Sequence, residues 1–489
     1  MIRRATRKLC VIETNEVPLK VWRTYADRHP ESTIARLLMQ GKLFQTVADD
    51  VGEDELYPSQ TWASLNTGLP YERHGIHWYN DPKPDRQQFW WHQAACRGKR
   101  VGLVNVLHSS PLSELAAEAR YAFLVPDCFA SDSDTLPAGY RHFQETNLRL
   151  TRGSGRVASL RAADLLHMAA RAAAMPGRYG VDAFSLGESL RALPALMRSR
   201  ERMRNMQFPP LASMFLRLMR THDPDIGIFF TNHIAAAQHR YWYALFPNDY
   251  AERLYDEAWC RRYRNEILDA VALMDRYLNR LSAFCARTNR ILVLVSSMGQ
   301  CANEQLEQRQ VSSERCFYRI DNPMRFLAAV AGTAAAECKT AMVPQYSYAF
   351  GDAAALESAA ARIRRFIGDN PALADSRIDA RGNTLTLTLA VGDMPDLLNV
   401  GSSRLGLREL GMGAVAVDDH HSGRHHPHGM LLVWNDAEDA LFSRKKTPHR
   451  FSYLAYAGNM RTYLDLPMPL PGSLQLGVQT PLARVAESG

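Results

Sequence analysis

The sequence predicts an α/β fold in which a mostly parallel central sheet carries a polar site at one edge. Short apolar runs of strand length alternate with longer segments of helical periodicity. Three of the buried runs, 9–12, 225–231 and 290–296, lead directly into polar clusters. Open α/β sheets bind their ligands beyond the carboxyl ends of the strands, so this arrangement predicts one site at that edge.

Composition and charge favour a soluble protein with an anionic small-molecule partner. The 489 residues are enough for a large core, and 46% apolar and 22% charged residues are ordinary for a globular protein. The net charge of +7 comes from scattered arginines, and no nucleic-acid-binding signature is present. Phosphorylated, sulfated or carboxylated small molecules therefore fit the charge.

Cysteine spacing and the N-terminus predict a cytoplasmic protein. The eight cysteines lie far apart without a C-x-x-C pair, which is typical of reduced thiols and of neither a disulfide framework nor a zinc knuckle. The basic N-terminus is apolar for only four residues before Glu13, and no run approaches 18 apolar residues. We expect no membrane segment, and the sequence leaves an oligomer open.

The first predicted strand, 9–12, ends in Glu13, Thr14, Asn15 and Glu16. These residues either cap the helix that begins near Pro18 or belong to a site, and the two interpretations weigh equally. Further along, residues 19–41 are predicted to be helical and 43–47, 101–107 and 121–125 to be strands. Residues 143–222 have helical periodicity and are expected to form a helical cap or insertion.

Residues 56–76, LYPSQTWASLNTGLPYERHGI, concentrate hydroxyl and amide side chains ahead of a Thr-Gly turn. A hydroxyl-rich turn that enters a helix presents a nucleophile together with backbone N–H donors. The alternative is a capped helix followed by a Gly-Pro loop.

The later strands end in candidate site residues as well. Strand 225–231 is followed by Asn232, His233, His239 and Arg240, and strand 290–296 by Ser297 and Gln300. Between these strands, residues 249–288 are predicted to form a long amphipathic helical region. Residues 322–332 and 353–367 are predicted helices, and the alternating segment 383–391 is a predicted strand of a smaller α+β subdomain.

Five histidines fall between residues 420 and 428, immediately before an apolar strand at 430–434. Histidines beside a core strand favour a site that handles metal, protons or anions. A solvated histidine-rich loop is the alternative.

Together these segments resemble the alkaline phosphatase superfamily, in its nucleotide pyrophosphatase/phosphodiesterase and sulfatase-like branch. The resemblance rests on VIETNE, TGLPYERHGI, NHIAAAQHRYW, LVLVSSMGQ, SGRHHPHGMLLVW and the C-terminal NMRTYLDLPMPLPGS. It implies a three-layer sandwich: a core over 1–335 that includes the insertion at about 143–222, a small α+β subdomain over 336–410, and a return to the core over 411–489.

The resemblance also implies which metal ligands are lost. The family places a threonine, serine or formylglycine nucleophile between two divalent metals held by aspartates and histidines. His239 and His425 match ligand histidines, whereas four ligand positions fall on Asn15, Ala235, Ser297 and Met298. A two-zinc centre is therefore not expected. We expect either no metal or a single divalent metal held by His239, His425 and either Glu13 or Glu16.

The family's nucleophile position falls on Pro58, so the nearest suitable hydroxyl is Thr61, with Ser59 as the runner-up. His239 or His425 would act as its base. The predicted substrate-binding residues are Glu13, Asn15, Glu16, Ser59, Asn232, His233, Arg240, Ser297, Gln300 and His428.

We therefore expect an enzyme, a hydrolase or group transferase that acts on a phosphate- or sulfate-ester-like small molecule. The alternative is a pseudoenzyme that binds an anionic ligand in the same pocket without turnover. A third hypothesis is a scaffold whose helical region, about 143–222, binds a protein partner.

Overall fold

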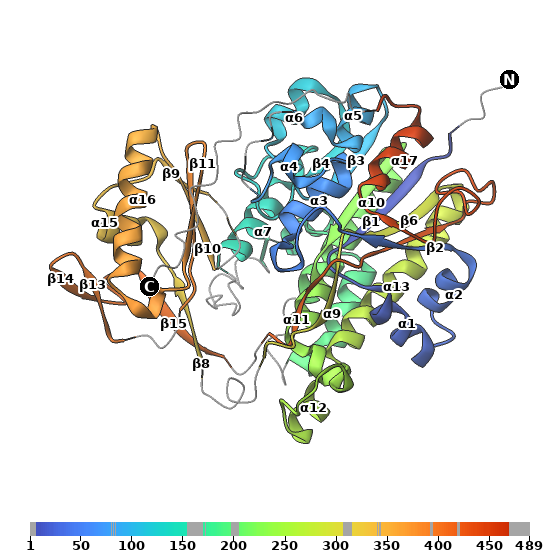
Figure 1. Cartoon of the computed structure of the whole chain (residues 1–489). Coiled ribbons are helices and arrows are strands. Elements are labelled where there is room, and N and C mark those ends of the chain that lie inside the picture. Colours follow the sequence, from blue (N-terminus) through green and yellow to red (C-terminus); the bar gives the residue numbers. More distant parts are fainter. Residues whose placement is uncertain are drawn as a thin grey trace.

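The computed structural model describes residues 6–79, 81, 83, 85–153, 170–171, 173–196, 205–306, 315–339, 341, 344–391, 395–417 and 421–468. Its centre is an eight-stranded sheet with the order β18-β2-β17-β6-β1-β5-β3-β4 (Figure 1). The strands are β1 (Leu9–Thr14), β2 (Lys42–Val47), β3 (Val101–Val104), β4 (Tyr121–Val125), β5 (Ile226–Thr231), β6 (Ile291–Ser296), β17 (Met430–Trp434) and β18 (Arg450–Ser452).

One strand of this sheet runs against the others. Strands β6, β1, β5, β3 and β4 are parallel to one another, and β18 is parallel to β2. Strand β17 is antiparallel to both β2 and β6, with Met430 opposite Ser296. The start of β17 therefore lies at the carboxyl edge of the parallel strands, and the chain just before it reaches that edge.

Two apolar layers cover the two faces of the sheet. The alternation along β1 separates them, because Leu9 and Val11 pack into one buried cluster and Cys10 and Ile12 into the other. Helices α3 (Pro58–Thr67), α5 (Trp90–Cys96) and α17 (Ala455–Leu464) contribute to the first layer. The second layer takes side chains from α1 (Leu19–Arg28), α2 (Thr33–Gln40), α10 (Phe208–His222), α11 (His233–Leu245) and α13 (Glu266–Arg287). The prediction of a three-layer α/β fold with a mostly parallel sheet is confirmed.

The main helices have these bounds: α1 (Leu19–Arg28), α2 (Thr33–Gln40), α3 (Pro58–Thr67), α4 (Tyr71–His74), α5 (Trp90–Cys96), α6 (Leu112–Glu118), α7 (Arg141–Gly153), α9 (Ala183–Leu196), α10 (Phe208–His222), α11 (His233–Leu245), α12 (Glu257–Tyr263), α13 (Glu266–Arg287), α15 (Pro323–Ala331), α16 (Ala353–Gly368) and α17 (Ala455–Leu464).

Several predicted elements are divided or shortened. The helical region 19–41 is two helices, because α2 starts anew where the Ser32 hydroxyl accepts a hydrogen bond from the Ala35 amide. Strand 101–107 ends at Val104, and regular α-helix in 249–288 begins only at Glu257.

The region 143–222 is more than a cap. Helix α10 packs on the sheet, with Phe215 and Met219 in the buried cluster around Phe229. Residues 154–169, 172 and 197–204 of this region lie outside the described residues, as does the end of the C-terminal NMRTYLDLPMPLPGS segment from residue 469.

A second lobe is built from α15, α16 and a four-stranded sheet (Figure 1, orange). That sheet has the order β11-β12-β10-β9, with β9 (Glu337–Lys339), β10 (Gln345–Ala349), β11 (Arg377–Arg381) and β12 (Thr384–Thr388). The hairpin of β13 (Leu397–Val400) and β14 (Ser403–Gly406) and the pair of β8 (Arg315–Ile320) and β15 (Met412–Val417) complete it. Its buried cluster extends from Ile320 to Met412, so it begins ahead of the boundary predicted at 336.

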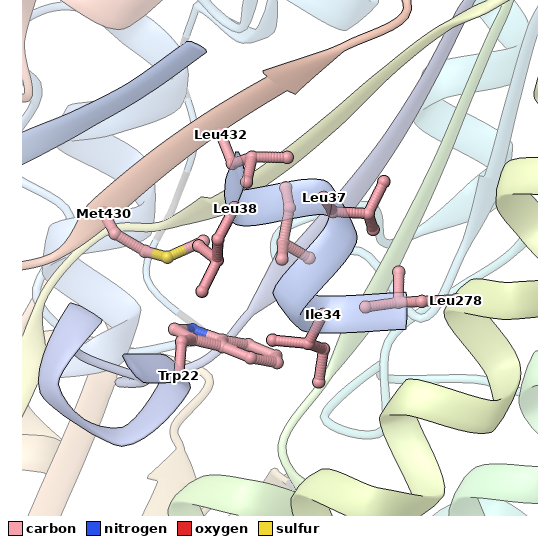
Figure 2. Close-up of a pocket in the computed structure, with 8 residues that line it drawn as sticks. Trp22, Ile34, Leu37, Leu38, Leu278, Met430 and Leu432 are labelled. Carbon is pink, nitrogen blue, oxygen red and sulfur yellow. The ribbon is translucent and has the colours of Figure 1, made fainter. Parts of the chain in front are cut away.

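A small apolar cavity lies between α1, α2, α13 and the sheet, lined by Trp22, Ile34, Leu37, Leu38, Leu278, Leu294, Met430 and Leu432 (Figure 2). It has room for about one water-sized sphere. Its lining side chains are apolar and include no acid, base or nucleophile, so the cavity is not a candidate active site. Within the described part of the chain, no helix combines the length and apolarity needed to cross a membrane.

Candidate active site

The site begins where β1 ends. Glu16 follows the strand in a left-handed conformation with φ 57°, which a non-glycine residue rarely adopts. The Gln238 side-chain amide donates a 2.9 Å hydrogen bond to the Glu16 carbonyl and holds this conformation. The Glu16 side chain is almost fully buried, so its charge depends on protein partners.

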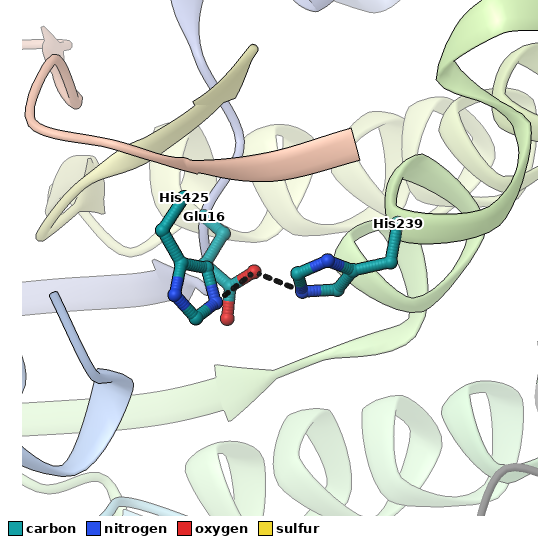
Figure 3. A group of neighbouring side chains, drawn as sticks. All are labelled: Glu16, His239 and His425. Atoms are coloured by element: carbon teal, nitrogen blue, oxygen red, sulfur yellow. Dashed lines mark ion pairs between the residues drawn. The ribbon is translucent and has the colours of Figure 1, made fainter. Parts of the chain in front are cut away.

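Two histidines supply those partners. Glu16 Oε2 lies 2.8 Å from His239 Nε2 and 3.4 Å from His425 Nε2. Figure 3 shows the carboxylate between the two rings, which come from helix α11 and strand β16 (Gly423–His426). The histidine side chains are 23% and 24% exposed, so a small ligand in solvent can reach them.

Backbone carbonyls orient both rings. His239 Nδ1 lies 3.2 Å from the Gly423 carbonyl oxygen, and His425 Nδ1 lies 2.7 Å from the Leu56 carbonyl oxygen. A carbonyl only accepts hydrogen bonds, so each Nδ1 carries a proton and each Nε2 faces the carboxylate. Both Nε2 atoms are thus available for a proton or a metal.

The direction and register of the strands explain why His425 arrives here. Strand β16 pairs antiparallel with β7 (Gly299–Ala302), and His425 stands opposite Gln300. Side chains of directly opposed residues share one face of the pair. Both therefore point at Glu16, and Gln300 Nε2 donates to Glu16 Oε2 and to the Ala235 carbonyl.

The charges in this cluster stabilise one another. Burial alone would raise the pKa of Glu16, but His425 and His239 outweigh it and hold that pKa well below its ordinary value. Burial alone would lower the pKa of His425, and the Glu16 carboxylate raises it above its ordinary value. Without a metal, the ionised form of Glu16 and the protonated form of His425 therefore favour each other.

An amide network extends the site across the sheet edge. Asn15 Nδ2 donates to Glu16 Oε1 at 2.6 Å and to Asn232 Oδ1 at 2.8 Å. The Trp62 indole donates to Asn15 Oδ1 at 2.8 Å. The ends of β1 and β5 and helix α3 are thereby joined, so the predicted convergence of Asn15, Glu16 and Asn232 is present.

The predicted nucleophile lies beside this network. Thr61 is buried on α3, and its Oγ1 lies 2.9 Å from the Ser297 hydroxyl. Ser59, the runner-up, donates instead to the His77 carbonyl. Thr61 meets Ser297 at the sheet edge because Ser297 directly follows β6, which lies next to β1.

Two predicted residues point away from Glu16. Glu13 lies under α3, where its Oε1 accepts a 3.0 Å hydrogen bond from Asn66. His233 bonds to Thr231 and to the Ala270 carbonyl and stacks on Phe208, and burial lowers its pKa to about 3.

His428 lies on the rim, with its Nε2 2.7 Å from Arg450. Arg240 is buried in α11, and its carbonyl accepts from Ser422.

The residues fit one divalent metal better than two. Two imidazole nitrogens and a carboxylate oxygen are suitable ligands, and the carbonyls on both Nδ1 atoms are the usual outer partners of metal-bound histidines. At the other implied metal position, Asn15, Ser297 and the buried Met298 offer no anionic ligand.

Sequence reasoning missed Gln238 and Trp62. Gln238 precedes His239 on the helix, and Trp62 follows Thr61, so adjacency to a predicted residue was the available signal.

Searches against protein families and curated proteins found no match. Solved structures do resemble the chain. Phosphonoacetate hydrolase from Sinorhizobium meliloti 1021 shares 13% identity, with 94% of this chain and 96% of that chain covered, at a TM-score of 0.40. Murine ectonucleotide pyrophosphatase/phosphodiesterase 5 shares 12% identity, with 95% and 96% covered, at 0.39. Wild-type alkaline phosphatase PafA shares 11% identity, with 94% and 96% covered, at 0.42.

Proposed function

We propose that the chain is a divergent member of the alkaline phosphatase superfamily, a hydrolase or group transferase that acts on a small phosphate- or sulfate-ester-like molecule. The observation that carries this proposal is the convergence of Glu16, His239 and His425, three side chains from distant parts of the sequence, at the carboxyl edge of the sheet. Acid/base groups that perturb one another at such an edge are typical of catalytic sites.

In this proposal the histidines move protons and the amides hold the anion. A hydroxyl attacks the phosphorus or sulfur atom and loses its proton to a histidine, and the departing ester oxygen receives a proton from His425. Glu16 keeps both rings oriented. Asn232 accepts a hydrogen bond from Asn15 through Oδ1, so its own amide N–H groups are the ones that would donate to a non-bridging oxygen.

A divalent ion held by Glu16, His239 and His425 would supply positive charge for the developing anion. Both imidazoles would then be neutral and would bind through Nε2. Dialysis of the purified protein against a chelator, with activity measured before and after, separates the metal-assisted form from the form in which the histidines act alone.

Thr61 is the proposed nucleophile, supported by its place beside Ser297 and the Asn15 network. If Thr61 forms the covalent intermediate, Thr61→Ala should lower kcat by about 100-fold or more, whereas Ser59→Ala should change it little. Retention of full activity in Thr61→Ala would assign the attack to water.

The pseudoenzyme alternative keeps the same pocket. The test is a panel of phosphate monoesters, phosphate diesters and sulfate esters, followed with wild type and Glu16→Gln. Turnover lost in Glu16→Gln supports the enzyme. Tight binding of phosphate or sulfate without turnover of any ester supports a pseudoenzyme.

A further inference from the structure

A second cluster of metal-type ligands lies away from Glu16. Helix α5 carries His92 and Cys96 four residues apart, and this spacing puts both side chains on one face of the helix. Glu118, the last residue of α6, approaches the same face. Because Glu118 is distant from His92 and Cys96 in the sequence, the three residues form no short sequence motif.

The distances match a tetrahedral metal site. His92 Nε2 lies 3.3 Å from Glu118 Oε2 and 3.7 Å from Cys96 Sγ, and all three ligand atoms lie within 4.8 Å of one another. Zinc bonds of ordinary length to nitrogen, oxygen and sulfur at tetrahedral angles separate such atoms by about 3.3–3.6 Å. A zinc ion can therefore enter with little movement of the side chains.

The His92 ring is held for binding through Nε2. Its Nδ1 is hydrogen-bonded to the hydroxyl of Tyr121, and the ring is fully buried against that tyrosine. When the protonated Nδ1 of His92 donates this hydrogen bond to the Tyr121 hydroxyl, the lone pair of Nε2 faces the thiol and the carboxylate. A metal-bound histidine usually donates its other ring N–H to a hydrogen-bond acceptor of this kind, which fixes the orientation of the ring.

This cluster is separate from the candidate active site. Tyr121 begins β4, so the cluster lies at the amino-terminal edge of the sheet, whereas Glu16 follows the carboxyl end of β1. Cys96 is half-buried and forms no disulfide, and Glu118 is 41% exposed, so an ion can enter from solvent.

We propose that His92, Cys96 and Glu118 bind one zinc ion, with Tyr121 as a positioning residue and the fourth position open to water. A thiolate with an imidazole favours zinc over magnesium or calcium. Binding would displace the thiol proton and would fasten the end of α5 to the end of α6. The proposal does not depend on the proposed function.

The test is a cobalt(II) titration of the full-length protein after metal removal. Cobalt at this site is expected to give a near-ultraviolet thiolate-to-cobalt charge-transfer band that saturates during the titration and disappears when zinc is added. The Glu16 cluster contains no sulfur, so His239→Ala should keep the band. Cys96→Ser should abolish it, and Cys260→Ser, which changes another half-buried cysteine, should keep it.

Tyr121→Phe retains the ring and removes only the hydroxyl. It should weaken cobalt binding by about tenfold or more while the band keeps its shape. Two results would overturn the proposal: a wild-type protein without a thiolate-to-cobalt band, or a band that survives in Cys96→Ser. If Cys96→Ser does not fold, Glu118→Gln replaces it, and unchanged cobalt affinity in that variant would overturn the proposal as well.

Discussion

Glu13 and Glu16 stand three residues apart and occupy opposite electrostatic environments. Glu16 turns out of the strand and meets two histidines, so its pKa is held low. Glu13 stays in the strand, points under α3 and finds only the Asn66 amide, so burial raises its pKa to about 7. Both residues were candidates from the sequence. The left-handed backbone conformation at Glu16, which the sequence pattern does not predict, directs only Glu16 to the histidines.

Glu13 should make stability depend on pH. The folded protein keeps this proton up to about pH 7, whereas the unfolded chain releases it near 4.5, so the free energy of unfolding falls as pH rises through that window. Glu13→Gln removes the titrating group. Over this pH window its free energy of unfolding should therefore fall by up to about 3 kcal/mol less than that of wild type. Urea unfolding of both proteins from pH 4.5 to 8 measures the difference. Identical pH profiles would show that Glu13 ionises freely in the fold.

At the scale of elements, the close approach of β16 to α11 assembles the site. Gly423 sits where a Cβ atom would lie 2.5 Å from the Gln238 carbonyl oxygen, and its own carbonyl holds the His239 ring. A side chain here would push β16, and His425 with it, away from Glu16.

Gly423→Ala should therefore lower kcat/KM by about 100-fold, since misplacement by about 1 Å costs that much, and should destabilise the fold by about 1–3 kcal/mol. Gly187→Ala is the matched control, because a Cβ there meets open space in α9. The control should keep its activity. Wild-type activity in Gly423→Ala would mean that the strand can shift without disturbing the cluster.

Element prediction succeeded where periodicity and burial agree. The predicted strands near 121–125, 225–231, 290–296 and 430–434 are all present, because continuous apolar runs are what buried strands require. The reversal of β17 was not predictable, since an apolar run has the same composition in either direction. That reversal brings the histidines before residue 430 to the carboxyl edge.

At the scale of the whole molecule, the two lobes meet close to the segment after α3. Arg381 of β11 donates to the Gly75 carbonyl at 3.1 Å and to the Tyr71 hydroxyl at 2.8 Å. The Trp78 indole donates to Asp379 of the same strand at 3.2 Å. The α/β class and a smaller α+β unit were predictable from alternating patterns, but these long-range contacts between polar residues leave no trace in local sequence.

Arg381→Ala should loosen this contact without unfolding the second lobe. Loss of partly exposed polar contacts worth about 1 kcal/mol should speed amide exchange in residues 71–79 about fivefold, while exchange in β12 stays unchanged. Hydrogen-deuterium exchange with mass spectrometry measures both regions. Faster exchange throughout β12 would instead assign Arg381 to the stability of its own lobe.

The central claim is that Glu16, His239 and His425 form the working site, and His239→Ala tests it most directly. On an ester that wild type turns over, kcat/KM of His239→Ala should fall by about 100-fold to 10,000-fold, because a positioned acid/base group contributes that much. His29→Ala, which removes a half-exposed histidine at the C-terminal end of α1, should stay within about twofold of wild type. Equal kcat/KM for His239→Ala and wild type would contradict the account.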